Sequence, residues 1–180
     1  MGALGKIELV DLRSVWSSEA LDFTPWLAEV ENIAFLGDAL RLNLKVKAQE
    51  KRVGRFLADI VCRDIATDSW VLIENQLERS DHRHLGQILT YAAGLELEAA
   101  TVVWIAPAFC EEHRKALRWL NGITDERFRF FGVTLELLRI SGSPQLRDSP
   151  SHSLRMIGAA RFERQQRRSR RSNPQEQRGA

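Results

Sequence analysis

The stretch that decides the fold runs Asp59-Ile60-Val61-Cys62-Arg63, then through the polar residues 64–69, then Trp70-Val71-Leu72-Ile73-Glu74-Asn75-Gln76. Two apolar runs of strand length joined by a short polar turn predict a β-hairpin, and the nearly continuous apolar second run predicts a central strand. An acid lies at the margin of each run, Asp59 in the first and Glu74 in the second. An unpaired buried carboxylate costs on the order of several kcal/mol, so these acids indicate a functional site.

The hairpin also predicts how the polar side chains meet. Glu74 and Gln76 are two residues apart on one strand, so their side chains point to the same face, about 6.5–7 Å apart. Asp59 lies on the neighbouring strand, about 4.8 Å away, and all three can converge. Two carboxylates with open coordination positions suit Mg²⁺, or Mn²⁺ in its place, because Mg²⁺ prefers hard oxygen ligands and keeps several waters. Such an ion activates water and stabilises a phosphate in transfer, and Gln76 would orient the water.

Further elements follow on both sides of the hairpin. Thr24 and Pro25 start a helix that runs to about Leu42. After the hairpin, Ser80 or Asp81 caps a second helix, and two acids open a third. In chain order, the predicted elements are a helix at 24–42, strands at 43–48, 54–62 and 70–76, a helix from 80 or 81 to 94, a strand at 101–106, a helix at 111–122 and one or two strands at 128–140. A helical crossover between the third and fourth strands predicts a parallel pair, so the fold class is α/β with a mixed sheet.

The helix after the hairpin adds polar groups near the same site. His84, Gln87 and Tyr91 share a face beside its apolar stripe and can point at the carboxylates. The alternative for each is an ordinary helix surface or a satisfied hydrogen bond. His82 and His84 resemble a metal pair in sequence, but two residues apart on a helix they face different ways.

Composition allows one globular domain and a tail. The chain has 180 residues and no apolar run of about 18 residues that would predict a membrane span. Its N-terminus lacks the apolar core of a signal peptide. Cys62 and Cys110 are far apart and fit no metal spacing, so we expect small core residues in a reduced, cytoplasmic protein.

Charge divides the chain into two parts. The net charge is +2, but residues 151–180 hold eight Arg and two Glu, which leaves residues 1–150 at about −4. The body is therefore not a generic basic nucleic-acid binder. We expect a domain over 1–140 and a disordered, Arg-rich tail over 141–180, where Ser, Pro, Gln and Arg dominate. The run 165–171 could contact phosphates or be a solvated tail without a specific role.

The order of elements and several short strings resemble a known group. The chain is similar to the PD-(D/E)XK nuclease superfamily, which includes restriction endonucleases, Holliday-junction resolvases and tRNA-splicing-endonuclease-like folds. Within it, the chain resembles an uncharacterised prokaryotic domain family over roughly residues 10–140. The strings that carry this resemblance are Asp22-Phe23-Thr24-Pro25-Trp26-Leu27, Val53-Gly54-Arg55-Phe56, Ile73-Glu74-Asn75-Gln76-Leu77-Glu78, Asp81-His82-Arg83-His84-Leu85-Gly86-Gln87, Tyr91-Ala92-Ala93-Gly94, Trp104-Ile105-Ala106 and Glu112-His113-Arg114-Lys115-Ala116-Leu117.

The resemblance implies a restriction-endonuclease-like αβββαβ core and roles for particular residues. Asp59 would be the metal-binding aspartate, Glu74 the second acid, and Gln76 stands where Lys is usual. An acid from the first helix is often a further ligand; Glu29 is the candidate, and Glu31 and Glu50 are its rivals.

The sequence is compatible with three functions. The first is a Mg²⁺- or Mn²⁺-dependent nuclease acting on DNA or RNA, with Asp59, Glu74, Gln76 and Gln87 at its site. The second is a non-catalytic module that binds nucleic acid or protein on the same scaffold. The third is purely structural, with the acids paired to Arg55, Arg63 or Arg79. A homodimer is compatible with the sequence but not required by it.

Overall fold

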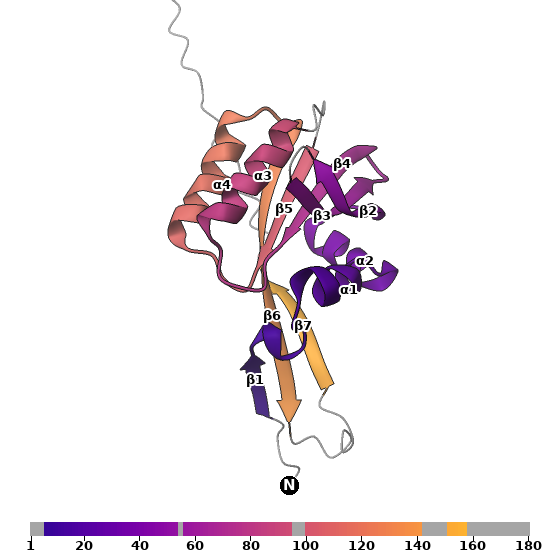
Figure 1. Cartoon of the computed structure of the whole chain (residues 1–180), viewed down its shortest axis with the longest axis vertical. Helices are drawn as coiled ribbons and strands as arrows, with labels where there is room; N and C mark the ends of the chain where they lie inside the picture. The colour runs from indigo at the N-terminus through magenta and orange to yellow at the C-terminus, as the bar shows by residue number, and fades with distance from the viewer. Residues whose placement is uncertain (1–5, 54–55, 95–99, 142–150, 158–180) are drawn as a thin grey trace, which may run out of the picture.

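The elements of the fold follow the predicted order. The structure, a computed structural model, describes residues 6–53, 56–94, 100–141 and 151–157. Figure 1 shows a sheet with helices on both sides. The elements are β1 (Lys6–Val10), η1 (Leu12–Ser14), η2 (Glu19–Phe23), α1 (Thr24–Leu27), α2 (Val30–Leu40), β2 (Leu44–Val53), β3 (Phe56–Asp64), β4 (Ser69–Asn75), α3 (His82–Gly94), β5 (Ala100–Ala106), α4 (Glu111–Ile123), β6 (Phe128–Ser141) and β7 (Ser151–Ile157).

The sheet is mixed, as the sequence predicts. Within the described part of the chain it has seven strands in the order β1-β6-β5-β4-β3-β2, with β7 also paired to β6. Strands β2, β3 and β4 are antiparallel neighbours, whereas β4, β5 and β6 are parallel. The parallel pairs are joined through α3 and α4, because a parallel connection needs a crossover. The predicted α/β class, the mixed sheet and the αβββαβ order of elements are confirmed.

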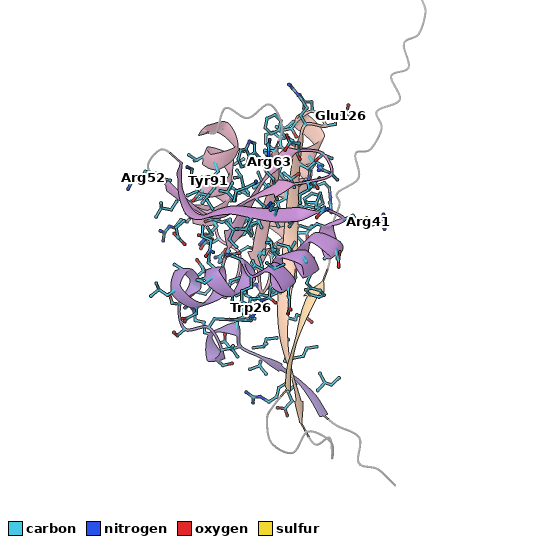
Figure 2. All side chains as sticks on the ribbon, turned by 90° about the vertical axis from the view of Figure 1, so that its right-hand side faces the viewer. Trp26, Arg41, Arg52, Arg63, Tyr91 and Glu126 are labelled. Carbon is cyan, nitrogen blue, oxygen red and sulfur yellow. The ribbon has the colours of Figure 1, made fainter. Side chains whose placement is uncertain are left out.

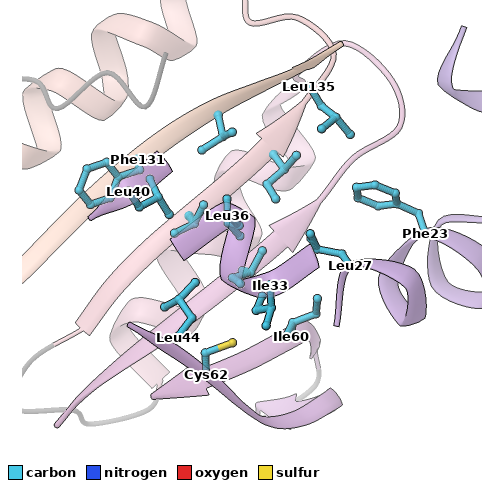
Figure 3. Close-up of a cluster of buried hydrophobic side chains, with 14 of the residues drawn as sticks. Phe23, Leu27, Ile33, Leu36, Leu40, Leu44, Ile60, Cys62, Phe131 and Leu135 are labelled. Carbon is cyan, nitrogen blue, oxygen red and sulfur yellow. The ribbon is translucent and has the colours of Figure 1, made fainter. Parts of the chain in front are cut away.

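Two apolar clusters hold the layers together, one on each face of the sheet. On the first face, α2 contributes Ile33, Leu36 and Leu40, which recur at helical spacing and pack on Ile60 and Ile73. Figure 3 shows this cluster beneath α2. The second cluster lies under α3 and α4 and includes Val61, Leu72, Ile88, Trp104 and Leu117. From Ile60 to Cys62 and from Val71 to Ile73, successive residues enter opposite clusters, so Glu74, which follows Ile73, lies on the face covered by α3 and α4.

The first predicted helix is in fact two helices. Helix α1 ends at Leu27 and α2 begins at Val30, because Glu29 between them has an extended backbone with ψ of 148°. The Asn32 side chain donates a hydrogen bond to the carbonyl of Trp26 across the break, at 2.8 Å. Glu29 therefore lies at the break, before the first residue of α2, rather than within a continuous first helix.

Strands at the two ends of the chain also differ from the prediction. Strand β1 is not predicted by the sequence, and it pairs with the far half of β6. Residues 151–157 fall in the segment expected to be disordered, yet they form β7 beside β6. The remaining residues of that Arg-rich segment, 142–150 and 158–180, lie outside the described residues. Among the described residues, no helix has the length and apolar character to cross a membrane.

Candidate functional site

Two acids, the half-buried Asp59 and the buried Glu74, occupy neighbouring strands at one end of the sheet. The antiparallel register that pairs Ile60 with Ile73 places the next residues outward, Asp59 and Glu74, opposite each other. Their side chains therefore share a face. Asp59 Oδ2 accepts a hydrogen bond from the backbone N–H of Asn75, at 2.6 Å. Glu74 is only 3% exposed, and its Oε2 has no hydrogen-bond partner in the described structure. A buried acceptor without a donor is costly, which makes this pair the strongest candidate for a site.

A bulge in the edge strand turns a third acid, the exposed Glu50, to the face of the pair. The register of β2 shifts between Val46 and Ala48, and as a result Val46 packs in the α2 cluster while Ala48 packs in the α3 cluster. One extra residue moves every later side chain to the other face. Glu50 therefore comes opposite Asp59, on the face of the acid pair. Its φ of +49° is unusual for a residue with a side chain, and such strain gathers at functional positions.

A fourth acid, Glu19, comes from η2 rather than from the first helix. Glu19 Oε2 accepts a hydrogen bond from the Leu77 backbone N–H, at 2.8 Å, just beyond the end of β4. The predicted acid, Glu29, is instead exposed and accepts a bond from the Asn32 side chain. Glu31, its rival, is exposed on α2. No motif in the sequence singles out Glu19, because only the path of η2 across the sheet edge brings it here.

Burial and mutual repulsion favour the protonated form of these acids. Burial, followed by the charges of Glu19 and Glu50, raises the pKa of Asp59 to about 7, although the Asn75 N–H acts in the opposite direction. The pKa of Glu74 rises to about 9, first through burial and then through the charge of Asp59. Burial and the charge of Glu19 also raise the pKa of Glu50. No basic residue is among the causes of these pKa shifts. A bound cation would therefore relieve the repulsion between the carboxylates.

The donor set fits a hard divalent cation. Among the described residues, no group of three His, Cys, Asp or Glu side chains is already arranged around a metal position. The fit depends instead on two carboxylates, Asp59 and Glu74, the second with a buried oxygen that lacks a donor. Mg²⁺ is often held by one or two carboxylates and keeps several waters, so two protein ligands are sufficient for it.

Helix α3 covers the pair with polar groups. The Gln87 side chain donates from Nε2 to the Tyr91 hydroxyl at 3.1 Å, and Tyr91 donates to the carbonyl of Leu57 at 2.6 Å. Burial and the charge of Glu74 raise the pKa of Tyr91, which places this hydroxyl beside the acids. Gln87 Oε1 is buried without a partner in the described structure. Gln87 thus reaches the site mainly through Tyr91.

Gln76 shares the face of Glu74, but both of its amide protons are donated to other protein groups and its oxygen accepts one hydrogen bond. Its Nε2 donates to the carbonyl of Arg79 and to Asp81 Oδ2, both at 2.9 Å. Its Oε1 accepts from Trp104 Nε1 at 3.1 Å. The carboxamide therefore ties β4 to β5 and to the start of α3. Any contact with water would fall to the second lone pair of Oε1.

The two histidines of α3 have separate partners. His84 Nδ1 contacts Asp81 Oδ1 at 2.9 Å, which corresponds to the satisfied hydrogen bond expected as the alternative for this residue. His82 Nδ1 lies 2.8 Å from His113 Nε2 on α4, and His113 Nδ1 lies 2.8 Å from Ser80 Oγ. His82 and His84 do not form a pair.

Comparison with known proteins shows similarity to two solved structures only over part of this chain. No protein-family model and no curated protein matches this sequence. Two solved structures are similar to part of it. The crystal structure of a repair endonuclease from Pyrococcus abyssi has a TM-score of 0.44 and 21% identity, over 57% of this chain and 44% of that one. The structure of an EndoMS–dsDNA2 complex has a TM-score of 0.43 and 17% identity, over 59% of this chain and 45% of that one. The chain thus spans less than half the length of either structure, and the likeness concerns part of the fold only.

The purely structural alternative finds no support in the described residues. Arg63 pairs with Asp68 at 3.0 Å and lies 4.4 Å from the centre of the Trp70 ring. Arg79 meets the site only through its backbone carbonyl, and Arg55 lies outside the described residues. No ion pair to Asp59 or Glu74 is present among the described side chains. The acids are therefore not explained as halves of sheet-edge salt bridges.

Proposed function

We propose that this protein is a Mg²⁺- or Mn²⁺-dependent nuclease that cleaves phosphodiester bonds in DNA or RNA. The observation that carries the proposal is the buried Glu74 carboxylate, which lies opposite Asp59, has one oxygen that lacks a donor and forms no ion pair among the described side chains. A site built to hold a cation explains why the fold tolerates this repulsion. The resemblance of the hairpin and α3 strings to PD-(D/E)XK nucleases agrees with the same chemistry.

Each residue of the site has a task in this proposal. Asp59 and Glu74 hold the ion, and Glu19 and Glu50 add negative charge around it. When bound, such an ion would supply Lewis-acid activation of a phosphate and of a water. The Asn75 N–H fixes one oxygen of Asp59, so the other oxygen keeps a defined direction. Asp59 and Glu74 would release their protons on binding a cation, since burial and mutual repulsion raise the pKa of each acid.

Gln76 supports the site by position rather than by charge. A lysine at this place would add a positive charge beside the scissile phosphate, and a carboxamide does not. Gln76 holds the start of α3, and hence Tyr91 and Gln87, against the acid pair. The electrostatic stabilisation of the reaction would then depend on the ion.

A cleavage assay tests the proposal directly. The full chain is incubated with labelled single- and double-stranded DNA and RNA in Mg²⁺, in Mn²⁺ or in EDTA. We expect metal-dependent products that Asp59→Asn and Glu74→Gln each reduce at least 100-fold, because each removes a ligand. Glu111→Gln, on the exposed start of α4, is the matched control and keeps the parental rate. Equal activity in the parent and both site variants would attribute the cleavage to a contaminant.

The same assay decides which further acid belongs to the site. Glu19→Gln should reduce cleavage, because Glu19 acts on both buried acids. Glu29→Gln should have a smaller effect, since its carboxylate is exposed and bonded to Asn32. The reverse order would support Glu29 as the further ligand that the family resemblance implies.

The second candidate is a binding module without turnover. It is favoured by one observation, the complete use of the Gln76 amide protons in bonds that hold the fold together. This candidate predicts oligonucleotide binding that is equal in Mg²⁺ and EDTA and no cleavage under any metal. Asp59→Asn would then leave affinity unchanged.

A further inference from the structure

The open edge of the sheet is formed by β2. This strand pairs only with β3 among the described strands, so its other side carries unpaired backbone groups. Figure 2 looks onto this edge, with Arg41 just before the strand and Arg52 near its end. A strand of this length extends about 33 Å. It is therefore long enough to lie along several nucleotides of an extended chain.

Basic side chains lie along this edge on both faces of the sheet, because the bulge at Val46–Ala48 changes the face on which later residues lie. The exposed basic residues of the edge are Arg41, Lys45, Lys47, Lys51 and Arg52. None of them forms an ion pair within the described residues. We refer to these five residues as the basic edge. The charge is local, because residues 1–150 as a whole carry about −4.

The basic edge is continuous with the acidic site. Glu50 lies between Gln49 and Lys51 on the same strand, and the bulge at Val46–Ala48 directs it to the face of Asp59. A polyanion lying along β2 would thus pass next to the carboxylates. Without a cation the four acids would repel it, whereas with a cation they would attract a phosphate. The arrangement thus places the basic edge next to an acidic site whose attraction for phosphate would depend on a bound cation.

We propose that the basic edge binds the phosphate backbone of a nucleic-acid strand and guides it to the Asp59–Glu74 pair. This proposal rests on the proposed function for the identity of the polyanion. Lysines on an edge strand also discourage pairing with other chains. That role alone predicts no change in nucleic-acid affinity when the charges are removed.

Binding measured without metal separates the edge from the chemistry. The full chain, with its Arg-rich segment present throughout, is titrated with a fluorescein-labelled 30-nucleotide DNA strand in EDTA over a range of salt concentrations. The edge variant is Lys45→Gln/Lys47→Gln/Lys51→Gln. The matched control is Arg83→Gln/Arg114→Gln/Lys115→Gln, which removes the same charge from exposed positions on α3 and α4. Thermal melts of both variants confirm that each is folded.

The two variants should differ clearly. We expect the edge variant to bind at least 10-fold more weakly than the parent at low salt, with the slope of log K against log salt reduced by about 2, since each phosphate contact on a single strand contributes about 0.7. The control should stay within about twofold of the parent, apart from the general effect of net charge. Equal losses in the two variants, or no binding by the parent, would overturn the proposal. Both variants are also tested for binding to anionic phosphatidylserine vesicles. An edge variant that loses vesicle binding while its oligonucleotide binding is unchanged would also overturn the proposal.

Failure of the cleavage proposal gives a different pattern. Binding that depends on the basic edge, without cleavage, would support the basic edge as a binding surface and contradict only the proposed nuclease activity. If the edge variant cleaves substrate in a metal-dependent reaction at the parental rate, with substrate below saturation, the role of the basic edge is contradicted and the nuclease proposal is supported. The two proposals therefore fail independently.

Discussion

Asp59 accepts a hydrogen bond from the backbone N–H of Asn75, while Glu74, the residue just before that N–H, has a buried oxygen with no donor. The peptide N–H of Asn75 thus satisfies one oxygen of the first acid, whereas one oxygen of the second acid is buried without a donor. Both acids lie on the same face of β3 and β4, and both have raised pKa values. The fold therefore holds two acids whose ionised forms it disfavours.

The first prediction is that stability falls as pH rises from about 5 to 9. The ordinary pKa values of Asp59 and Glu74 are 3.8 and 4.5, and in the folded protein they rise to about 7 and about 9. The folded state therefore binds more protons in this window, and stability is lost as pH rises from the ordinary pKa towards the folded one. Thermal melts in EDTA measure it. The Asp59→Asn/Glu74→Gln variant should show a flatter profile, and an equally steep one would contradict the assignment.

The hairpin and the position of its acids could be predicted because their signals are local. Apolar runs define β3 and β4, and a side-chain period of two puts Glu74 on a known face. The crossover through α3 likewise requires β5 to be parallel to β4. These features depend on residues close together in the chain.

Glu19 and Glu50 could not be placed in this way. The alternation of residues 43–48 predicts a regular strand, and nothing in it marks the bulge that turns Glu50 towards Asp59. Glu19 reaches the site through a long-range bond to the Leu77 N–H. β1 was missed for a related reason, because Ile7 and Leu9 are exposed and the strand depends on pairing with β6. Register and long-range pairing are tertiary properties.

A second prediction concerns metal binding. At pH 8, millimolar Mn²⁺ or Mg²⁺ should raise the melting temperature, because a ligand bound only by the folded state stabilises it, by about 1.4 kcal/mol at ten times its Kd. Asp59→Asn should abolish the shift. At pH 5.5 the shift should be much smaller, since both acids are then protonated in the fold. A shift of equal size in Asp59→Asn would place the ion elsewhere.

A third prediction concerns Gln76 and the lysine usual at its position. Gln76→Lys keeps donors for the Arg79 carbonyl and Asp81 but removes the acceptor for Trp104 Nε1, at a cost of about 1–3 kcal/mol. Gln76→Glu should cost more at pH 8, since it places an acceptor against two acceptors. Urea melts measure both. In a Trp104→Phe background the additional cost of Gln76→Lys should largely disappear, and an undiminished cost would contradict the role of the indole N–H.

The last prediction separates strain from charge at Glu50. Its backbone lies in the left-handed region at φ of +49°, and its carboxylate is repelled by Glu19. Glu50→Gln removes only the charge, whereas Glu50→Gly also relieves the backbone, by about 1 kcal/mol. We therefore expect stability at pH 8 to increase in the order parent, Glu50→Gln, Glu50→Gly.

Metal affinity should change in the opposite direction. Both Glu50 variants lose one negative charge beside Asp59 and Glu74, so the melting-temperature shift in Mn²⁺ should decrease equally in the two. Asp68 has the same φ of +49° in the turn between β3 and β4, far from the acids in the register, and Asp68→Gly is the matched control. It should gain stability from backbone relief, offset by loss of its bond to Arg63, and keep the full metal response. A reduced metal response in Asp68→Gly as well would mean that backbone relief, rather than the Glu50 charge, governs binding.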